Sequence, residues 1–206
     1  MAEKKDILIA TSNHGKAERY RNLVRHIDSE IILHMPQDLG IEPIEVKENG
    51  TLKENAEQKA LAYLGKVPIP ILANDTGFYV EGEGLVENPK RIALGENGRE
   101  ANHEEVCEAM ILFWRGIAEK HGGQVEAAWI DEFTLVMPNG SVRQETAQRD
   151  VILTNTVFGQ AHVQLPVRAL YISKATGKPA ALHTQEEELL ELAPIMKALA
   201  RLLSPN

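Results

Sequence analysis

The chain has 206 residues, of which 43% are hydrophobic and 25% are charged, so its composition is that of a folded globular protein rather than a disordered one. Its formal net charge of −8 argues against a nucleic-acid partner or an anionic membrane surface. It lacks a signal peptide and any apolar run of the ~18–20 residues that cross a bilayer, and Cys107 is its lone cysteine, so we expect one cytoplasmic domain over residues 1–206.

The N-terminal segment has the pattern of a strand, a tight loop and a helix. The apolar run Ile7–Ala10 stops at Thr11-Ser12-Asn13-His14-Gly15-Lys16, after which apolar residues recur at helical spacing. Such a loop presents unpaired backbone N–H groups, the positive end of a helix dipole and the Lys16 ammonium at one place, which suits a polyphosphate. The glycine spacing of a P-loop is absent. The alternative is an ordinary strand-to-helix turn with Ser12 or Asn13 as the helix cap.

The next segments continue the alternation of strands and helices. We expect a short strand at 31–33, a loop over 36–50, and a helix that begins at the capping box Thr51-Leu-Lys-Glu54. Residues 69–73 predict a further strand, which Asn74-Asp75-Thr76-Gly77 interrupts before it resumes at 78–80. A carboxylate at the carboxyl end of a strand lies where α/β sheets bind ligands, although Asp beside Gly is also common in purely structural turns.

The second half is richer in strand patterns. We expect a long mobile loop over 81–100 and then a helix over 103–120, in which Cys107 is a packed and unreactive thiol. Strands over 128–137 and 141–146 follow, joined by Pro138-Asn139-Gly140, and further strands are expected over 151–153 and 167–173. A turn at 176–178 precedes a helix over 184–203 that Pro194 kinks or divides. Strand–helix alternation followed by antiparallel strands predicts an α/β fold with a mixed central sheet and flanking helices.

Three segments within the first 80 residues are more informative as a set than singly. They resemble the inosine/xanthosine triphosphate pyrophosphatase family, house-cleaning enzymes that hydrolyse aberrant purine nucleoside triphosphates to monophosphate and pyrophosphate. The family pattern T-[GS]-N-x-x-K matches Thr11–Lys16, T-[FL]-x-E-N-A-x-x-K-A matches Thr51–Ala60, and A-D-D-[ST]-G-L-x-V matches Ala73–Val80. The pair Phe158-Gly159 falls where the family carries F-G-Y-D. The match is specific over residues 7–80 and weak thereafter.

The resemblance implies a Mg²⁺-dependent enzyme that acts on nucleoside triphosphates, forms homodimers, and folds as one two-lobed domain with the active-site cleft between the lobes. The residues that it assigns to substrate binding are Thr11, Ser12, Asn13, His14, Gly15, Lys16, Asn55, Lys59, Thr76, Phe158 and Gly159. It assigns Glu48, Asp75 and Asn74 to the metal, and Asp75 and Lys16 to catalysis. A carboxylate close to Mg²⁺ is a feeble base, so we expect Asp75 to orient a metal-acidified water rather than carry its proton.

Two departures from the family pattern leave alternatives open. Asn74 stands where the family has an aspartate, which removes one negative charge beside the expected metal. Gln160-Ala161-His162 replaces Y-D-P, and residues 184–194 stand in place of the S-H-R triplet that reads the purine, so the sequence does not predict the preferred base. His162, Arg168 and Lys174 either form a different base pocket or are solvated. A nucleotide-binding regulatory protein without turnover, or a nucleotide hydrolase of different base specificity, are the competing functions.

Overall fold

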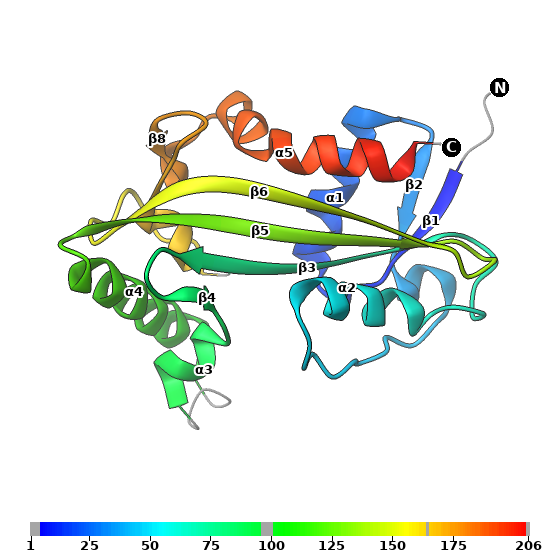
Figure 1. Cartoon of the computed structure of the whole chain (residues 1–206), viewed down its shortest axis with the longest axis horizontal. Coiled ribbons are helices and arrows are strands. Elements are labelled where there is room, and N and C mark those ends of the chain that lie inside the picture. Colours follow the sequence, from blue (N-terminus) through cyan, green and yellow to red (C-terminus); the bar gives the residue numbers. More distant parts are fainter. Residues whose placement is uncertain (1–4, 96–100, 164, 205–206) are drawn as a thin grey trace. The chain divides into compact units, whose positions relative to one another are not determined.

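The structure is a computed structural model that describes residues 5–95, 101–163 and 165–204 (Figure 1). The chain forms two compact units, each described here by itself. The first comprises Met1–Thr76, Asp131–Ala147 and Pro194–Asn206, and the second comprises Gly77–Ile130 and Gln148–Ala193. Three strands and one helix contribute residues to both units.

The first unit is built around parallel strands. Its elements are β1 (Lys5–Ile9), α1 (His14–Ile27), β2 (Ile31–His34), a 3₁₀ turn (Pro36–Leu39), α2 (Leu52–Leu61), and parts of β3 (Ile71–Val80), β5 (Gln124–Val136), β6 (Val142–Thr154) and α5 (Gln185–Leu203). β1 pairs in parallel with β2 on one side and with β3 on the other. Parallel neighbours need crossover connections, and α1 and α2 lie in those connections. The strand, loop and helix expected at the N-terminus are confirmed.

Side-chain caps set the first residues of both helices. Asn13 precedes α1, and its side chain accepts a hydrogen bond from the Lys16 backbone N–H at 3.0 Å. The turn therefore includes the helix cap that the alternative interpretation expected. Thr51 and Glu54 form the expected capping box of α2: Thr51 Oγ1 accepts from the Glu54 N–H at 3.3 Å, and Glu54 Oε2 accepts from the Thr51 N–H at 2.8 Å. These caps fix where Lys16 and Lys59 lie on their helices.

The core of the first unit joins β1, α2 and β3. Its buried members are Leu8, Ala10, Ala60, Tyr63, Val67, Ile71, Ala73 and Val136. The small residues Ala56 and Ala60 are completely buried, which lets α2 approach the strands closely. The hydroxyl of Tyr63 accepts a hydrogen bond from the Ile44 N–H at 2.8 Å, so the loop that precedes α2 is tied to this core.

The second unit has an aromatic core. Its elements are the remaining parts of β3, β5, β6 and α5 together with β4 (Gly84–Val86), α3 (Pro89–Leu94), α4 (His103–Lys120), the 3₁₀ turns Pro166–Leu170 and Ala180–Leu182, β7 (Tyr171–Ser173) and β8 (Lys178–Pro179). Phe78 packs edge-on against Trp114 and Trp129, with ring centroids 5.0 and 4.7 Å away. α3 lies along α4, as Figure 1 shows. The pairing of β7 with β6 is antiparallel, so the predicted mixed α/β sheet is confirmed.

The expected interruption of a strand at residues 74–77 is wrong. β3 runs without a break from Ile71 to Val80 and carries Asn74, Asp75 and Thr76 inside it. Polar residues at these positions predict a turn, but each of their side chains finds partners on a neighbouring strand or helix. The strand therefore continues, because these polar side chains find their hydrogen-bond partners within the protein and do not need solvent.

Two other expectations are wrong in part, while the end of the chain follows the prediction. Residues 81–95 contain β4 and α3 rather than a loop, and the part of the expected loop at 96–100 lies outside the described residues. Of the expected strand over 167–173, residues 171–173 form β7 but 167–170 form a 3₁₀ turn, whereas the strand expected at 151–153 is confirmed as part of the longer β6. The hairpin turn is confirmed, with Gly140 at φ +83°, and α5 continues through Pro194.

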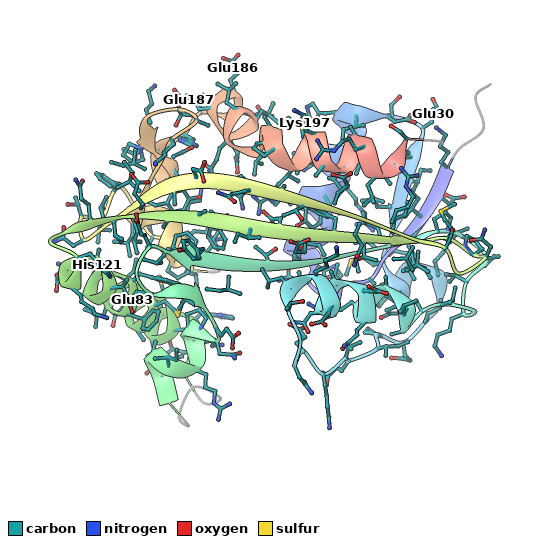
Figure 2. The ribbon with its side chains drawn as sticks, in the orientation of Figure 1. Glu30, Glu83, His121, Glu186, Glu187 and Lys197 are labelled. Atoms are coloured by element: carbon teal, nitrogen blue, oxygen red, sulfur yellow. The ribbon has the colours of Figure 1, made fainter. Side chains whose placement is uncertain are left out.

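In the second unit, Cys107 and the ion pairs of Glu83 have an ordinary structural explanation. Cys107 is half-buried on α4, and burial followed by the charge of Glu108 raises the pKa of its thiol, which disfavours the reactive thiolate. Glu83 and His121 lie close together at one end of α4 (Figure 2), where Glu83 also pairs with Lys120. Among the described residues, every helix is too short or too polar to cross a membrane.

Candidate functional site

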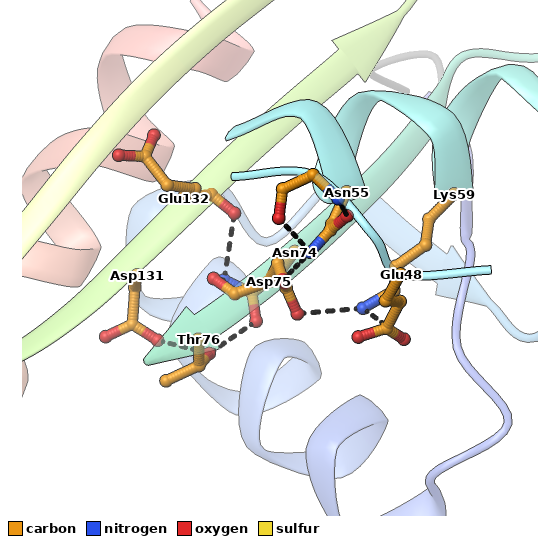
Figure 3. Close-up of polar contacts among 9 residues, drawn as sticks. Glu48, Asn55, Lys59, Asn74, Asp75, Thr76, Asp131 and Glu132 are labelled. Atoms are coloured by element: carbon orange, nitrogen blue, oxygen red, sulfur yellow. Dashed lines mark hydrogen bonds and ion pairs between the residues drawn. The ribbon is translucent and has the colours of Figure 1, made fainter. Parts of the chain in front are cut away.

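The centre of the candidate site is an ammonium group between two carboxylates. Lys59 Nζ lies 2.8 Å from Asp75 Oδ1 and 2.9 Å from Glu48 Oε1 (Figure 3). Lys59 comes from α2, Asp75 from β3, and Glu48 from the loop before α2. The Asp75 side chain is 10% exposed and that of Glu48 is 50% exposed. The group is therefore anchored in the protein on one side and open to solvent on the other.

Asn55 fixes the other oxygen of Asp75. Its Nδ2 donates to Asp75 Oδ2 at 3.2 Å and to the Gly50 carbonyl at 3.1 Å, while its Oδ1 accepts from the Gly50 N–H at 3.0 Å. Asn55 is buried and lies one turn before Lys59 on α2, so both residues reach the same carboxylate. Asn55 and Lys59 therefore share one face of α2.

Lys16 experiences the charges of this group. Burial, followed by the neighbouring charge of Lys59, lowers the pKa of Lys16 from 10.5 to about 8, whereas Asp131 and Asp75 act to raise it. Lys16 is in the first turn of α1, where the helix dipole also favours an anion. We call Lys16, Glu48, Asn55, Lys59 and Asp75 the carboxylate–lysine cluster. All five belong to the first unit.

The opposite face of β3 carries a second polar group. Successive strand residues point to opposite faces, so Asp75 faces α2 while Asn74 and Thr76 face the other way. Thr76 Oγ1 lies 2.8 Å from Asp131 Oδ1 and 2.9 Å from Asn74 Oδ1, and Asn74 Nδ2 donates to the Glu132 carbonyl at 3.1 Å (Figure 3). Asp131 is completely buried on β5.

The donor set suits a magnesium ion bound together with phosphate. Glu48 Oε1 and Asp75 Oδ1 both contact Lys59 Nζ, so the two carboxylates are already arranged around a positive charge. Mg²⁺ is commonly held by one or two carboxylates plus phosphate oxygens of the substrate. No group of three or more His, Cys, Asp or Glu that could hold a metal occurs in the described part of the chain. The Asn74 amide is bonded on the other face of β3 and does not join Glu48 and Asp75.

The other expected site residues are placed as follows. Thr11, Ser12 and Asn13 form the turn into α1, and His14 and Gly15 are its first residues; all but the half-buried Thr11 are exposed. Phe158 and Gly159 belong to the second unit, where the Phe158 N–H donates to the Ala169 carbonyl. Arg168 pairs with Glu188, and Lys174 pairs with Glu126, so both cations of the suggested base pocket have acidic partners.

Asp131 is the residue that the sequence reasoning missed. It occupies the same alternation as Phe133 and Leu135, which are buried on β5. A carboxylate at an inward position of an apolar strand is rare unless it is paired, and that mismatch was the available signal.

Comparison with known proteins agrees with this arrangement. The model of the Ham1 family matches residues 7–110, which include all three motif segments and extend from β1 through β3 of the first unit into α4 of the second. The chain belongs to the Ham1 family. This membership confirms the family resemblance drawn from Thr11–Lys16, Thr51–Ala60 and Ala73–Val80.

Curated relatives of this Ham1 family member match over part of their length. The chain is 36% identical over 143 residues to a "dITP/XTP pyrophosphatase" of Symbiobacterium thermophilum, covering 66% of this chain and 64% of that one. It is 38% identical over 76 residues to the protein of the same name from Aquifex aeolicus, covering 36% and 35%. For a third, from Anaeromyxobacter dehalogenans, the identity is 29% over 121 residues, covering 58% and 48%. The chain thus spans between about one third and two thirds of these relatives.

Solved structures extend the likeness of the fold to the whole chain. A Staphylococcus aureus Ham1 protein superposes with a TM-score of 0.72 at 18% identity, covering 97% of this chain and 98% of that one. A Coxiella burnetii HAM1 protein gives a TM-score of 0.73, with the same identity and coverage. At this identity, the likeness establishes the fold.

Proposed function

We propose that this Ham1 family member is a Mg²⁺-dependent nucleoside triphosphate pyrophosphatase that releases a nucleoside monophosphate and pyrophosphate. The observation that carries the proposal is that Lys16 and Lys59, from two different helices, both experience the charge of Asp75. Two cations and a carboxylate within one compact unit suit a metal-bound phosphate chain. The names of the curated relatives support aberrant purine triphosphates such as dITP and XTP as substrates.

Each residue of the carboxylate–lysine cluster has a distinct part in this proposal. Lys16, together with the backbone N–H groups at the start of α1, binds phosphate oxygens. Lys59 binds a second phosphate group once it exchanges its carboxylate partners for the ligand. Mg²⁺ held by Glu48 and Asp75 would neutralise phosphate charge and acidify a water. Asp75 orients that water, because Asn55 holds its other oxygen in place.

Release of pyrophosphate tests the proposal directly. The full chain is incubated with Mg²⁺ and a panel of inosine, xanthosine, guanosine and pyrimidine triphosphates, and pyrophosphate is measured over time. We expect release from at least one purine triphosphate and loss of release on chelation of the metal. Lys53 is exposed on the same helix as Lys59, so Lys53→Ala is a matched control for Lys59→Ala. Equal rates for the two variants would contradict the assigned role of Lys59.

A nucleotide-binding regulatory protein is the second candidate, and Asn74 is the observation that favours it. An uncharged amide stands beside Asp75 where the family pattern carries a second carboxylate. Binding of triphosphates across the panel without any release of pyrophosphate would favour this alternative. Assembly as a cytoplasmic homodimer is part of the main proposal, and light scattering of the purified chain tests the dimer.

A further inference from the structure

Asp131 is a buried carboxylate that the proposed chemistry does not yet use. It is 0% exposed and lies on β5, in the same alternation as Phe133. Phe133 packs edge-on against Tyr20 of α1, with ring centroids 5.5 Å apart, so this face of β5 meets the helix that carries Lys16. A charged group is costly to bury unless its position serves an interaction.

The contacts of Thr76 show one such interaction. Its hydroxyl has a single proton and two neighbouring acceptors, Asp131 Oδ1 at 2.8 Å and Asn74 Oδ1 at 2.9 Å. Neither acceptor can donate to Thr76, because a carboxylate and an amide oxygen have no proton. The charged oxygen is the stronger acceptor. The Thr76 proton is therefore engaged within the protein, and the hydroxyl is held in one orientation.

The same carboxylate acts on Lys16. The charged groups that act on this ammonium are Arg19 of α1, Lys59 of α2, Asp75 of β3 and Asp131 of β5. Lys59 and Arg19 disfavour the protonated form, and the two carboxylates favour it, Asp131 more strongly than Asp75. Residue 74, next to Thr76 on the same face, is an amide and contributes no charge.

We propose that Asp131 is a positioning residue of the phosphate site: from β5, it orients the hydroxyl of Thr76 and places beside Lys16 the negative charge that residue 74 does not supply. This inference rests on the proposed function only in so far as the site binds a triphosphate. The feature to test is whether a carboxylate at residue 74 can replace the one at residue 131.

The experiment measures binding of inorganic tripolyphosphate with Mg²⁺ to the full chain by calorimetry between pH 6.5 and 9.5. We compare the unaltered chain with Asp131→Asn and with the double variant Asn74→Asp/Asp131→Asn. Asp131→Asn should weaken binding at pH 8, and its loss of affinity with rising pH should begin at a lower pH, because Lys16 gives up its proton more readily. The double variant should return the profile toward that of the unaltered chain.

Matched controls separate positioning from simple charge removal. Glu145 is a carboxylate on β6 of the same unit that pairs with Arg201, and Glu145→Gln should leave the profile unchanged. Thr76→Val should weaken binding without moving the profile along the pH axis, and Thr76→Ser should restore the affinity. The Thr76 pair also tests the proposal if Asp131→Asn fails to fold, as judged by circular dichroism.

Several results would overturn the proposal. One is an unmoved profile in Asp131→Asn, and another is tighter binding at every pH, as mere relief of anion repulsion would give. Failure of the double variant to recover affinity would also overturn it, as would full affinity in Thr76→Val. Absence of pyrophosphate release by the unaltered chain, with the Asp131-dependent binding intact, would remove the proposed function and leave this inference standing.

Discussion

The two compact units each contain a charged cluster, and the two clusters differ in access to solvent. In the first unit, the side chains of Lys59 and Glu48 are 18% and 50% exposed. In the second unit, Glu191 of α5 binds Arg149, whose Nη1 lies 3.1 Å away, and accepts from the Tyr171 hydroxyl at 2.8 Å, with all three residues buried. His183 completes this buried set, with Nδ1 3.1 Å from Glu191 Oε2.

This difference in access to solvent distinguishes a candidate ligand-binding cluster from a buried structural one. A fully enclosed ion pair has no route for a ligand, and its groups are arranged for one another. The carboxylate–lysine cluster instead keeps the Glu48 carboxylate half exposed, beside the Lys59 ammonium. Burial and the adjacent Glu191 raise the pKa of Tyr171, whereas burial and the adjacent Lys59 bring the pKa of Lys16 to about 8. The open cluster thus contains a group that titrates near physiological pH.

The largest expected effect concerns Asp75. Asp75→Asn should lower kcat by roughly 10²- to 10³-fold or more, because the variant loses the charge that we propose to hold the metal and orient the water. Steady-state pyrophosphate release measures this. Asp150→Asn, at an exposed position of β6, is the control and should retain activity. A near-normal rate in Asp75→Asn would show that this carboxylate has been given the wrong role.

The enclosed cluster should respond in stability instead. Glu191→Ala removes the carboxylate that pairs with the buried Arg149 and accepts from Tyr171, and we expect a loss of about 3–5 kcal/mol in the free energy of unfolding. Urea denaturation measures it. Glu186 lies exposed near the start of the same helix (Figure 2), and Glu186→Ala should change stability little. If Glu191→Ala were as stable as Glu186→Ala, the distinction drawn between the two clusters would fail.

Removal of the titrating cation should affect binding and stability in opposite directions. Lys16→Met should weaken triphosphate binding by roughly 10- to 100-fold, since one charge-assisted contact is lost. It should also stabilise the fold by on the order of 1–3 kcal/mol, because a depressed lysine pKa means that the fold disfavours the charged form. Calorimetry and thermal unfolding measure the two effects, and Lys66→Ala, at an exposed position, is the control. A less stable Lys16→Met would contradict this account of its pKa.

The pH dependence of the reaction follows from the same group. Lys16 is charged below its pKa of about 8 and neutral above it. The value of kcat/KM reports the free enzyme, so it should fall as pH rises, with a midpoint near 8. The midpoint should disappear in Lys16→Met. A profile that stays flat up to pH 9.5 would mean that the ammonium does not bind substrate.

The smallest expected change concerns Glu48 and stability. Its side chain is half exposed, so Glu48→Gln should change the free energy of unfolding by less than about 0.5 kcal/mol. Activity should nevertheless require severalfold more Mg²⁺, which a titration of pyrophosphate release against the metal measures. An unchanged requirement for Mg²⁺ would remove Glu48 from the metal site. A large loss of stability would place this residue among the structural charges instead.

Local signals in the sequence predicted the parts of the fold that local interactions decide. The cap at Asn13, the box of Thr51 and Glu54, and the helix His103–Lys120 all depend on residues within a few positions of each other. The turn at Gly140 does too, because its positive φ suits glycine. The family motifs then located the residues of the carboxylate–lysine cluster.

The missed features depend on partners far away in the chain. Asn74 and Thr76 stay within a strand because their side chains bond to β5, more than fifty positions later. Nothing in their immediate surroundings shows those partners. The role of Asp131 was hidden for the same reason, since its neighbours in the sequence, Ile130 and Glu132, do not show that it contacts Thr76 on β3. The cleft expected between two lobes and the ligand contacts of Phe158 and Gly159 stay predictions.

Gly50 links the geometry of the site to a measurable rate. Its N–H and carbonyl are both bound by Asn55, and a Cβ at this position would lie 2.8 Å from Glu54 Oε2, so only glycine fits beside the capped helix. The Glu48-bearing loop is thereby docked before any ligand arrives. Exchange of the Gly50 amide hydrogen with deuterated solvent requires opening of its bond to Asn55, the residue that also donates to Asp75. The exchange rate of this one amide therefore reports how often the contact between the loop and Asn55 opens.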